Sequence, residues 1–549
     1  MKEVFIPVQQ GSSNAAFQQA LAKGSNKQPL VINLEKGKYY FSRDESVKKV
    51  YHVSNTTSEE EDTDPTKHIA LHLSNLKNVT INGNGATLVM LGEMTSFVVN
   101  ESSNITFKNV NFDYETPTQP EITVVEVEPQ AIVVKVHPRS IYRIHGDRLE
   151  WYGDGWSFDR GIAQAYDADQ DITWRTESPM EKFYKVEELE KNVLKLYFKD
   201  TFATAVGRTY QLRDAIRDEV AGFINLSKDI TFEQVNFFYL GNFGVVCQTS
   251  ENISFDRMSF APEPGSGRSN AGFADFIQVS GCRGLITVKN SNFAGAHDDP
   301  INVHGTHLQV TELIGNHKVK VRYMHPQTYG FQSFFKGDKV EFIHSKSLNS
   351  LEEMTVKSAL MLDDRTILIE FEKPFRNPVV HKGLDLVLEN ATWTPEVHIL
   401  NNYFTRIPTR GILVTTRKKV RIEGNYFHRM QMSGILIAND ALSWFESGMV
   451  RDVLIRNNVF YECGYPIINI APENNLQEQA VHKDIKIEDN IFILKKDVGP
   501  VVSAKSVDGL LFQNNKILSP DIHLTPLHKL VVQQDVNRAT LFNNILIQK

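Results

Sequence analysis

The chain repeats one short pattern many times, and this repetition limits the folds available to it. Residues 104–112, 229–237, 252–260 and 419–427 each begin with alternating apolar and polar side chains and close on phenylalanine. The alternation predicts a strand with one buried face. Asparagine stands near the middle of most units and predicts a turn, because it tolerates left-handed backbone and hydrogen-bonds locally.

The spacing of these units is regular. The first aliphatic residue recurs after 23 residues from Ile230 to Ile253, after 33 from Ile253 to Ile286, and after 23 again from Val397 to Val420. Fixed periods of this size indicate stacked repeats, none of which can bury its apolar face alone. Because no helical pattern separates the units, the sequence predicts an all-β chain folded as a right-handed parallel β-helix.

A second strand is expected in each coil. It is predicted at residues 276–279, 301–303, 411–414, 434–437, 466–470 and 500–503. The units also contain asparagines expected to stack as a ladder of turns, namely Asn402, Asn425, Asn458, Asn490 and Asn515.

Two intervals between units are far longer than one coil. They run for 125 residues from Ile105 to Ile230 and for 111 residues from Ile286 to Val397. Each therefore holds an insertion the size of a small domain. Apolar and polar residues alternate within both, which predicts antiparallel strands and two small β-barrel or sandwich modules.

The chain is accordingly divided into five regions. Residues 1–113 form an N-terminal cap and the first coils, 114–221 the first module, 222–310 coils with an acidic cluster, 311–392 the second module, and 393–549 the C-terminal coils. A short helix is expected at residues 13–21, with Gly-Ser before it as the N-cap, covering the open end of the β-helix.

Bulk properties exclude some partners. The net charge of −7, with acids and bases mixed, disfavours nucleic acid, which would favour a concentrated basic surface. No apolar run reaches the ~20 residues that span a bilayer. The N-terminus has no hydrophobic signal core, so the compartment is cytoplasmic, or periplasmic or secreted if a signal was removed. Whether copies form a homo-oligomer stays open.

Three cysteines, Cys247, Cys282 and Cys463, lack metal-ligand spacing and are expected to be buried thiols.

Three aspartates precede two of the predicted strands. Asp275 and Asp299 precede apolar-polar runs of similar pattern, and Asp298 is adjacent to Asp299. Equivalent positions of successive coils stack ~4.8 Å apart, so we expect the carboxyl groups to crowd together. A lone aspartate in a turn is usually structural. A like-charged cluster, however, costs stability unless it is used, which marks it as a candidate site.

Such a cluster suits glycoside hydrolysis. In the inverting reaction one carboxylic acid protonates the departing oxygen, and a carboxylate activates water on the opposite face of the sugar. A retaining reaction needs a shorter carboxyl separation, and spacing in the sequence does not exclude it.

Several neighbours are expected to contact a sugar. Arg410 precedes the equivalent strand of the next coil, and the irregular residues 439–448 offer the flat face of Trp444 and the acceptors of Glu446. Arg410 could instead form a structural ion pair, and Trp444 could instead cover the edge of the β-helix. The full set of expected substrate-binding residues is His297, Asn302, His304, Arg410, Asn439, Asp440, Trp444 and Glu446.

A metal site is the competing use of clustered acids and histidines. His297, Asp298, Asp299, His304 and His307 could be written as transition-metal ligands. Adjacent residues on a strand point in opposite directions, however, and no matching spacing occurs elsewhere. We therefore expect no metal and no cofactor.

These motifs resemble family 110 of the glycoside hydrolases, the α-1,3-galactosidases. The resemblance rests on Asp275, on residues 297–305 and on residues 439–452, and it covers nearly the whole chain. It implies an exo-acting, inverting, metal-independent hydrolase that removes terminal α-1,3-linked galactose from oligosaccharides or glycans. It also implies that Asp275, Asp298 and Asp299 carry the chemistry.

Some alternatives stay open. Polygalacturonases are mechanistically similar, although this chain lacks their Gly-His-Gly and Arg-Ile-Lys elements in the expected order. By analogy with them, Asp298 would be the acid, with Asp275 and Asp299 activating water. A uronate lyase or epimerase and a non-catalytic, adhesin-like carbohydrate-binding β-helix are the rival classes. The sequence does not tell linear α-1,3-galactosides from branched, blood-group-B-like glycans as substrates.

Overall fold

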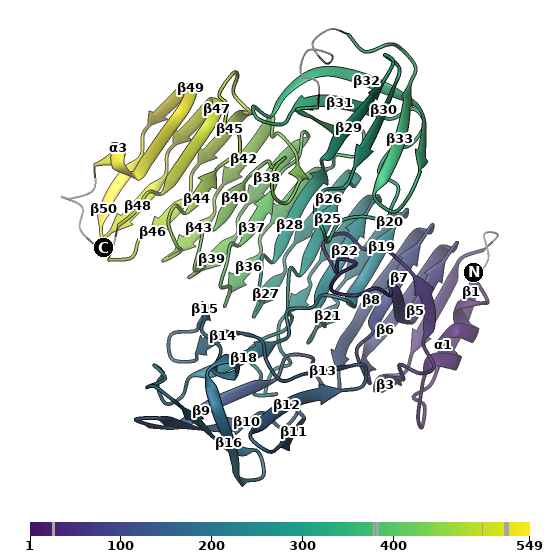
Figure 1. Ribbon diagram of the computed structural model, residues 1–549, viewed down its shortest axis with the longest axis vertical. Helices are drawn as coiled ribbons and strands as arrows, with labels where there is room; N and C mark the ends of the chain where they lie inside the picture. The colour runs from purple at the N-terminus through teal and green to yellow at the C-terminus, as the bar shows by residue number, and fades with distance from the viewer. Residues whose placement is uncertain (25–27, 377–378, 380–383, 497, 521–525) are drawn as a thin grey trace.

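A parallel β-helix forms the body of the protein, and one β-rich module projects from each side of it (Figure 1). This computed structural model describes residues 1–549 except 25–27, 377–378, 380–383, 497 and 521–525. The predicted register is confirmed, because Ile230, Ile253 and Ile286 pair in sequence across adjacent coils. The repeat spacing therefore corresponds to successive coils.

Each complete coil has three strands rather than the two expected. The aromatic residue that closes each unit lies on a strand of its own, which is only two to four residues long from the coil of Phe237 onward. A strand that short shows no alternation in the sequence, so the pattern alone predicts only the end of a turn. The β-helix therefore has three faces.

The strands of each face follow the chain from the N-terminus to the C-terminus. The first face contains β1 (Lys2–Ile6), β2 (Leu30–Leu34), β6 (Lys77–Met90), β8 (Ser103–Tyr114), β20 (Lys228–Glu233), β23 (Glu251–Asp256), β26 (Arg283–Lys289), β35 (Glu396–Leu400), β38 (Lys419–Glu423), β42 (Asp452–Arg456) and β45 (His482–Glu488). The second contains β3 (Lys38–Phe41), parts of β6 and β8, β21 (Asn236–Phe237), β24 (Ser259–Phe260), β27 (Asn292–Ala294), β36 (Tyr403–Thr405), β39 (Tyr426–His428), β43 (Val459–Tyr461), β46 (Ile491–Ile493), β48 (Lys516–Ser519) and β50 (Ile545–Gln548).

The third face positions the acidic cluster. It contains β5 (Thr66–Ser74), β7 (Thr95–Asn100), β19 (Val220–Asn225), β22 (Phe243–Gln248), β25 (Ile277–Ser280), β28 (Ile301–Thr306), β37 (Ile412–Val414), β40 (Ile435–Ile437) and β44 (Ile468–Ile470). The long strands β47 (Val502–Gln513) and β49 (Val531–Phe542) bend across the first and third faces, and α3 (Leu527–Leu530) precedes β49.

Two ladders run through the β-helix. Phenylalanines of the second face stack ring on ring at the coil spacing, for example Phe404 on Phe427 at 4.9 Å and Phe427 on Phe460 at 4.8 Å between centroids. The predicted asparagine ladder is confirmed, because the side chain of each asparagine bonds that of the next coil, as in Asn425 Nδ2 to Asn458 Oδ1 at 2.9 Å. The three cysteines are buried as free thiols, as predicted.

We expect Asn458→Ala to destabilise the fold by about 2–4 kcal/mol, because each buried polar group left unpaired costs about 1–3 kcal/mol. Asn458 accepts from the backbone and side chain of Asn425 and donates to Ile422 O and Asn490 Oδ1. Denaturant unfolding measures the loss. Asn544→Ala is the control, because this last rung of the ladder is partly exposed and water can replace it. An equal loss in both variants would contradict the ladder argument.

The predicted helix is present at the N-terminal end as α1 (Asn14–Leu21). It buries Phe17 against Tyr39 and Phe41, with ring centroids 5.7 and 5.1 Å apart. The N-cap is Ser13, whose side chain makes no capping bond, while the expected capping residue Ser12 accepts a hydrogen bond from Asn14 N at 3.3 Å through its Oγ. In the described residues, no helix is long and apolar enough to cross a membrane.

Module 1 lies between β8 and β19 and consists of two antiparallel sheets. A seven-stranded sheet has the order β15-β14-β18-β9-β10-β17-β16, and a three-stranded sheet β11-β12-β13 packs on it through Leu149, Trp151 and Trp156. The strands are β9 (Glu121–Glu128), β10 (Ala131–Val136), β11 (Tyr142–His145), β12 (Arg148–Gly153), β13 (Trp156–Phe158), β14 (Ile162–Asp167), β15 (Ile172–Thr176), β16 (Phe183–Glu190), β17 (Val193–Phe198) and β18 (Thr209–Arg213). A 3-10 turn, Pro179–Glu181, joins β15 to β16.

Module 2 is a closed six-stranded barrel inserted between β28 and β35. Its order is β29-β30-β33-β32-β31-β34. The strands are β29 (Leu308–Ile314), β30 (Lys318–Arg322), β31 (Lys339–His344), β32 (Asn349–Met361), β33 (Thr366–Phe371) and β34 (Leu386–Asn390). The barrel thus begins at Leu308, directly after β28 (Figure 1).

Candidate active site

A cavity of about 120 Å³ opens on the third face of the β-helix, in front of β28, β37 and β40. Its floor and walls are built by residues distant in the sequence. They are Asn55, Arg217, Asp275, Asp298, Asp299, Asn302, Arg410, Leu413, Thr415, Leu436, Ala438, Asp440, Trp444, Glu446 and Glu473. Carboxyl groups predominate among its polar groups, so the cavity is acidic.

The register of β25 and β28 brings two of the acids together. Ile277 pairs with Ile301, so Asp275 and Asp299 occupy equivalent positions, two residues before these partners. Asn302 Nδ2 donates to Asp275 Oδ2 at 3.1 Å. The next coil continues the stack, because Ile301 pairs with Ile412.

Arg410 occupies the corresponding position of that next coil and holds Asp299. Its backbone N and its Nε donate to Asp299 Oδ1 at 3.1 and 2.9 Å, and its Nη2 lies 2.8 Å from Asp299 Oδ2. A guanidinium that bonds both carboxylate oxygens fixes the orientation of the carboxylate and also stabilises its negative charge. Asp299 is therefore a rigid group at the base of the cavity.

Asp298 is the most exposed of the three acids and faces arginines from three directions. Its Oδ2 lies 3.7 Å from both Arg175 Nη2 and Arg217 Nη2, and its Oδ1 lies 3.8 Å from Arg410 Nη2. Arg175 belongs to β15 of module 1, and Arg217 lies in the segment that returns from module 1 to β19. Module 1 therefore supplies two of these three contacts.

Charge and burial act strongly on the stacked pair. Burial, together with the charges of Asp298 and Asp299, raises the pKa of Asp275 well above its ordinary value. Burial also raises the pKa of Asp299, although Arg410 opposes this effect. Carboxyl groups with displaced pKa values inside a cavity are typical of acid-base chemistry.

We expect Asp275→Asn to stabilise the fold at neutral pH by about 0.5–2 kcal/mol, the usual gain from one stabilising substitution, because it removes a buried carboxyl group that faces two like charges. Because the pKa of Asp275 is raised in the folded state, the parent loses stability as the pH rises above the unfolded value of about 3.9. The advantage of the variant should therefore vanish below about pH 3.9 and grow toward pH 7. Thermal unfolding at several pH values measures it, and a difference independent of pH would contradict the argument.

The loop between β40 and β41 (Glu446–Ser447) forms one wall. Asp440 folds it by accepting hydrogen bonds from the backbone N–H groups of Leu442, at 2.6 Å, and of Ser443, at 3.0 Å. Burial favours a raised pKa for Asp440, but these bonds outweigh it and hold the pKa below its ordinary value. Asp440 is therefore an ionised loop anchor as well as part of the cavity wall.

Trp444 stands at the rim and is 43% exposed. One face of its indole stacks on His325 of module 2, with centroids 4.4 Å apart and an angle of 22° between the rings. The stacking holds the indole in place from one side. Trp444 can therefore offer a fixed apolar surface to a sugar ring.

Glu446 is held by a segment that lies near the N-terminus. Asn55, in the connection between β4 (Val47–Val50) and β5, donates through Nδ2 to Glu446 Oε1 at 2.8 Å. Thr328 of module 2 donates in turn to Asn55 Oδ1 at 2.6 Å. Asn55 therefore ties together the N-terminal region, module 2 and the rim.

Three of the expected substrate contacts lie outside the cavity lining. His297, His304 and Asn439 are buried and do not line the cavity. His304 Nε2 lies 3.5 Å from Glu446 Oε1, and Asn439 Oδ1 accepts from Gly448 N, so both support the wall from behind. His307 is also buried, and its Nδ1 bonds Asp440 O. His297 is adjacent to Asp298 in the sequence, but its ring is buried against Gln119 and Gln211 instead of facing the cavity.

The other expected site residues do meet at the cavity. They are Asp275, Asp298, Asp299, Asn302, Arg410, Asp440, Trp444 and Glu446. The sequence pattern does not predict Arg217, Arg175 or Asn55 as site residues. Arg217 lies just before β19, a third-face strand, and this placement could have marked it. Within the described residues, no three His, Cys, Asp or Glu side chains are grouped so as to hold a metal ion.

Family models match all three parts of the architecture. GLAA-B beta-barrel domain I matches residues 120–209, and GLAA-B beta-barrel domain II matches residues 318–382. A model described as a right handed beta helix region matches residues 358–517. The predicted fold class, a right-handed parallel β-helix with two inserted β modules, is thereby confirmed.

Relatives with similar sequences cover nearly the whole chain. Alpha-1,3-galactosidase A of Bacteroides thetaiotaomicron is 51% identical over 99% of this chain and 95% of its own length. Alpha-1,3-galactosidase A of Bacteroides fragilis is 37% identical over 89% of this chain and 82% of its own length. Among solved structures, PfbA, a surface adhesin of Streptococcus pneumoniae, aligns over 99% of this chain and 90% of its own, with 11% identity and a TM-score of 0.40.

Proposed function

Since the chain belongs to the α-1,3-galactosidases, family 110 of the glycoside hydrolases, we propose that it releases one terminal galactose at a time with inversion at the anomeric carbon. The protein is a glycosidase, and its substrate is a glycan that carries α-1,3-linked galactose. The observation that carries the finer proposal is the unequal placement of the three acids in one small cavity.

Asp298 is the proposed general acid. In an exo-acting enzyme the terminal sugar enters first, so the leaving group lies on the solvent side of the cavity. The side chain of Asp298 is 16% exposed, whereas that of Asp299 is 2% exposed. The more exposed carboxyl group is the one that can reach the glycosidic oxygen, where the inverting mechanism requires its proton.

Asp275 and Asp299 are the proposed water-activating pair. They stack at equivalent positions of adjacent coils, and each is held by its own partner, Asn302 or Arg410. Buried and oriented in this way, they suit a small nucleophile such as water between them. The raised pKa of Asp275 supports this role, since it makes the carboxylate a stronger base toward the proton of water.

The shape of the cavity supports exo action. Walls come from the β-helix, from the segment around Asn55, from the return of module 1 at Arg217 and from the loop that carries Trp444. A site enclosed on several sides accepts the end of a chain more readily than its middle. We propose that Trp444 packs against the sugar next to the scissile bond, where a branch would distinguish blood-group-B-like glycans from linear ones.

Proton NMR of α-1,3-galactobiose hydrolysis tests this function. We expect free galactose to appear first as the β-anomer and to equilibrate later by mutarotation. First appearance of the α-anomer would overturn inversion, and release of longer fragments from extended glycans would overturn exo action. An unsaturated product that absorbs in the ultraviolet would point to a lyase. Rates on linear and on branched substrates then define the preference.

A further inference from the structure

We propose that module 1 positions Asp298 through an oriented chain of hydrogen bonds that ends on His297, the preceding residue. His297 is fully buried, and both of its ring nitrogens are occupied by glutamines of module 1. Gln119 Nε2 donates to His297 Nδ1 at 3.1 Å, and His297 Nε2 donates to Gln211 Oε1 at 2.7 Å. The ring therefore has no freedom to turn, and it anchors the turn that carries Asp298.

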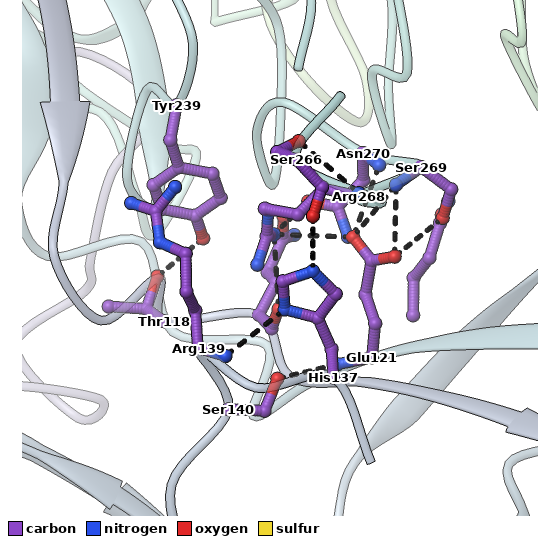
Figure 2. Close-up of polar contacts among 12 residues, drawn as sticks. Thr118, Glu121, His137, Arg139, Ser140, Tyr239, Ser266, Arg268, Ser269 and Asn270 are labelled. Carbon is purple, nitrogen blue, oxygen red and sulfur yellow. Dashed lines mark hydrogen bonds and ion pairs between the residues drawn. The ribbon is translucent and has the colours of Figure 1, made fainter. Parts of the chain in front are cut away.

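The chain of hydrogen bonds continues from Gln211 to the buried carboxylate of Glu121. Gln211 Nε2 donates to Ser269 Oγ at 2.7 Å, and Ser269 Oγ donates to Glu121 Oε2 at 2.8 Å. Figure 2 shows Glu121 meeting Ser269, Asn270 and Arg268 at this junction. Arg268 Nη2 lies 3.3 Å from Glu121 Oε1, and both side chains are almost completely buried.

Glu121 sets the direction of every bond in the chain. An ionised carboxylate only accepts, so the single hydroxyl proton of Ser269 must point to it. Ser269 Oγ then accepts from the amide of Gln211, which turns the carbonyl of that amide toward His297. This arrangement requires a proton on His297 Nε2 and leaves Nδ1 as the acceptor for Gln119.

The surroundings of the ring also keep His297 neutral. Burial, followed by the charges of Arg213, Arg175 and Arg268, lowers its pKa well below the ordinary value. A cationic ring would add to the three guanidinium groups that already face Asp298 and would further favour the ionised form of its carboxyl group. A neutral ring of fixed tautomer therefore suits a proton donor at the next position.

The residues of this chain of hydrogen bonds belong to the base of module 1 and to one turn of the β-helix. Glu121 and Gln211 lie opposite each other on the paired strands β9 and β18. Ser269 lies between β24 and β25, in the segment that leads to Asp275. The inserted module thus holds the proposed acid by its neighbour, in addition to the contacts of Arg175 and Arg217.

This inference rests on the proposed role of Asp298, and kinetics with two substrates test it. The variants are His297→Gln and the isosteric Gln119→Glu, which replaces the amide donor by an acceptor. We expect kcat on α-1,3-galactobiose to fall about 10²-fold in both, the scale of a 1 Å misplacement, with KM changed little. The loss should be much smaller on an aryl α-galactoside with a good leaving group. Gln119→Glu should also add a limb to the pH profile of kcat, because its carboxylate favours a charged ring.

His482→Gln is the matched control, because His482 is equally buried but lies in a C-terminal coil, where its Nδ1 accepts from Val450 N. It should lose stability without changing kcat or its dependence on the leaving group. Unchanged kcat in both test variants, or an equal loss on both substrates, would overturn the inference, provided that Asp298→Asn shows the leaving-group dependence. If Asp298→Asn lacks that dependence, the proposed role of Asp298 fails instead, and the inference fails with it. Should His297→Gln not fold, Gln119→Glu alone decides.

Discussion

Replacing Asp298 by Asn should slow hydrolysis of α-1,3-galactobiose by about 10²–10⁴-fold, the usual contribution of a general acid. The leaving sugar has a weakly acidic hydroxyl and needs a proton as the bond breaks. A dinitrophenolate needs none, so the same variant should hydrolyse dinitrophenyl α-galactoside within about ten-fold of the parent rate. Steady-state kinetics on both substrates measures the contrast.

A matched control for this experiment is Asp508→Asn. Asp508 also pairs with an arginine, since Arg538 Nε lies 2.7 Å from its Oδ1, but it lies on β47, far along the β-helix. Its replacement should leave both rates unchanged. An equal loss on both substrates in Asp298→Asn would show that Asp298 acts on the water side or only holds the site together.

Replacing Asp299 by Asn should abolish turnover of both substrates alike, by about 10³-fold or more if base catalysis and water positioning are lost together. A good leaving group does not restore the rate, because the step that is lost is the activation of water. Azide needs no base, so added azide should restore turnover of the aryl galactoside and give the β-galactosyl azide. Product analysis by NMR identifies that compound.

Because Asp299 is paired with Arg410, the stability of Asp299→Asn must be measured beside its activity. Arg410 holds Asp299 through both carboxylate oxygens, so Asp299→Asn removes its main charged partner and leaves only Asp298, 3.8 Å away. Thermal unfolding separates this structural cost from the catalytic one. A variant that is fully folded yet keeps its activity on galactobiose would remove Asp299 from the mechanism.

The sequence allowed the β-helix and the core of the site to be predicted because both obey one repeat. Once Ile277, Ile301 and Ile412 are aligned, the stacking of Asp275, Asp299 and Arg410 follows from the coil spacing alone. The inward phenylalanines and the asparagine ladder follow in the same way. A residue at a repeated position packs against its equivalents in the two adjacent coils, so its place can be predicted from the repeat.

The remainder of the site depends on contacts between parts that share no repeat. Arg175 reaches Asp298 only because module 1 folds back against the β-helix, and His325 meets Trp444 only because module 2 does so. No spacing in the sequence encodes either approach. The sequence does not predict the orientation of His297 for a related reason, since its partners Gln119 and Gln211 belong to module 1.

Both modules leave and re-enter the β-helix through strands that pair with each other. In module 1, Glu121 lies opposite Gln211, and in module 2, Leu308 lies opposite Leu388. Each insertion therefore begins and ends at one point, and the coils on either side stack as though nothing stood between them. A change within either module would therefore reshape the walls of the cavity while the stacked carboxyl groups keep their register.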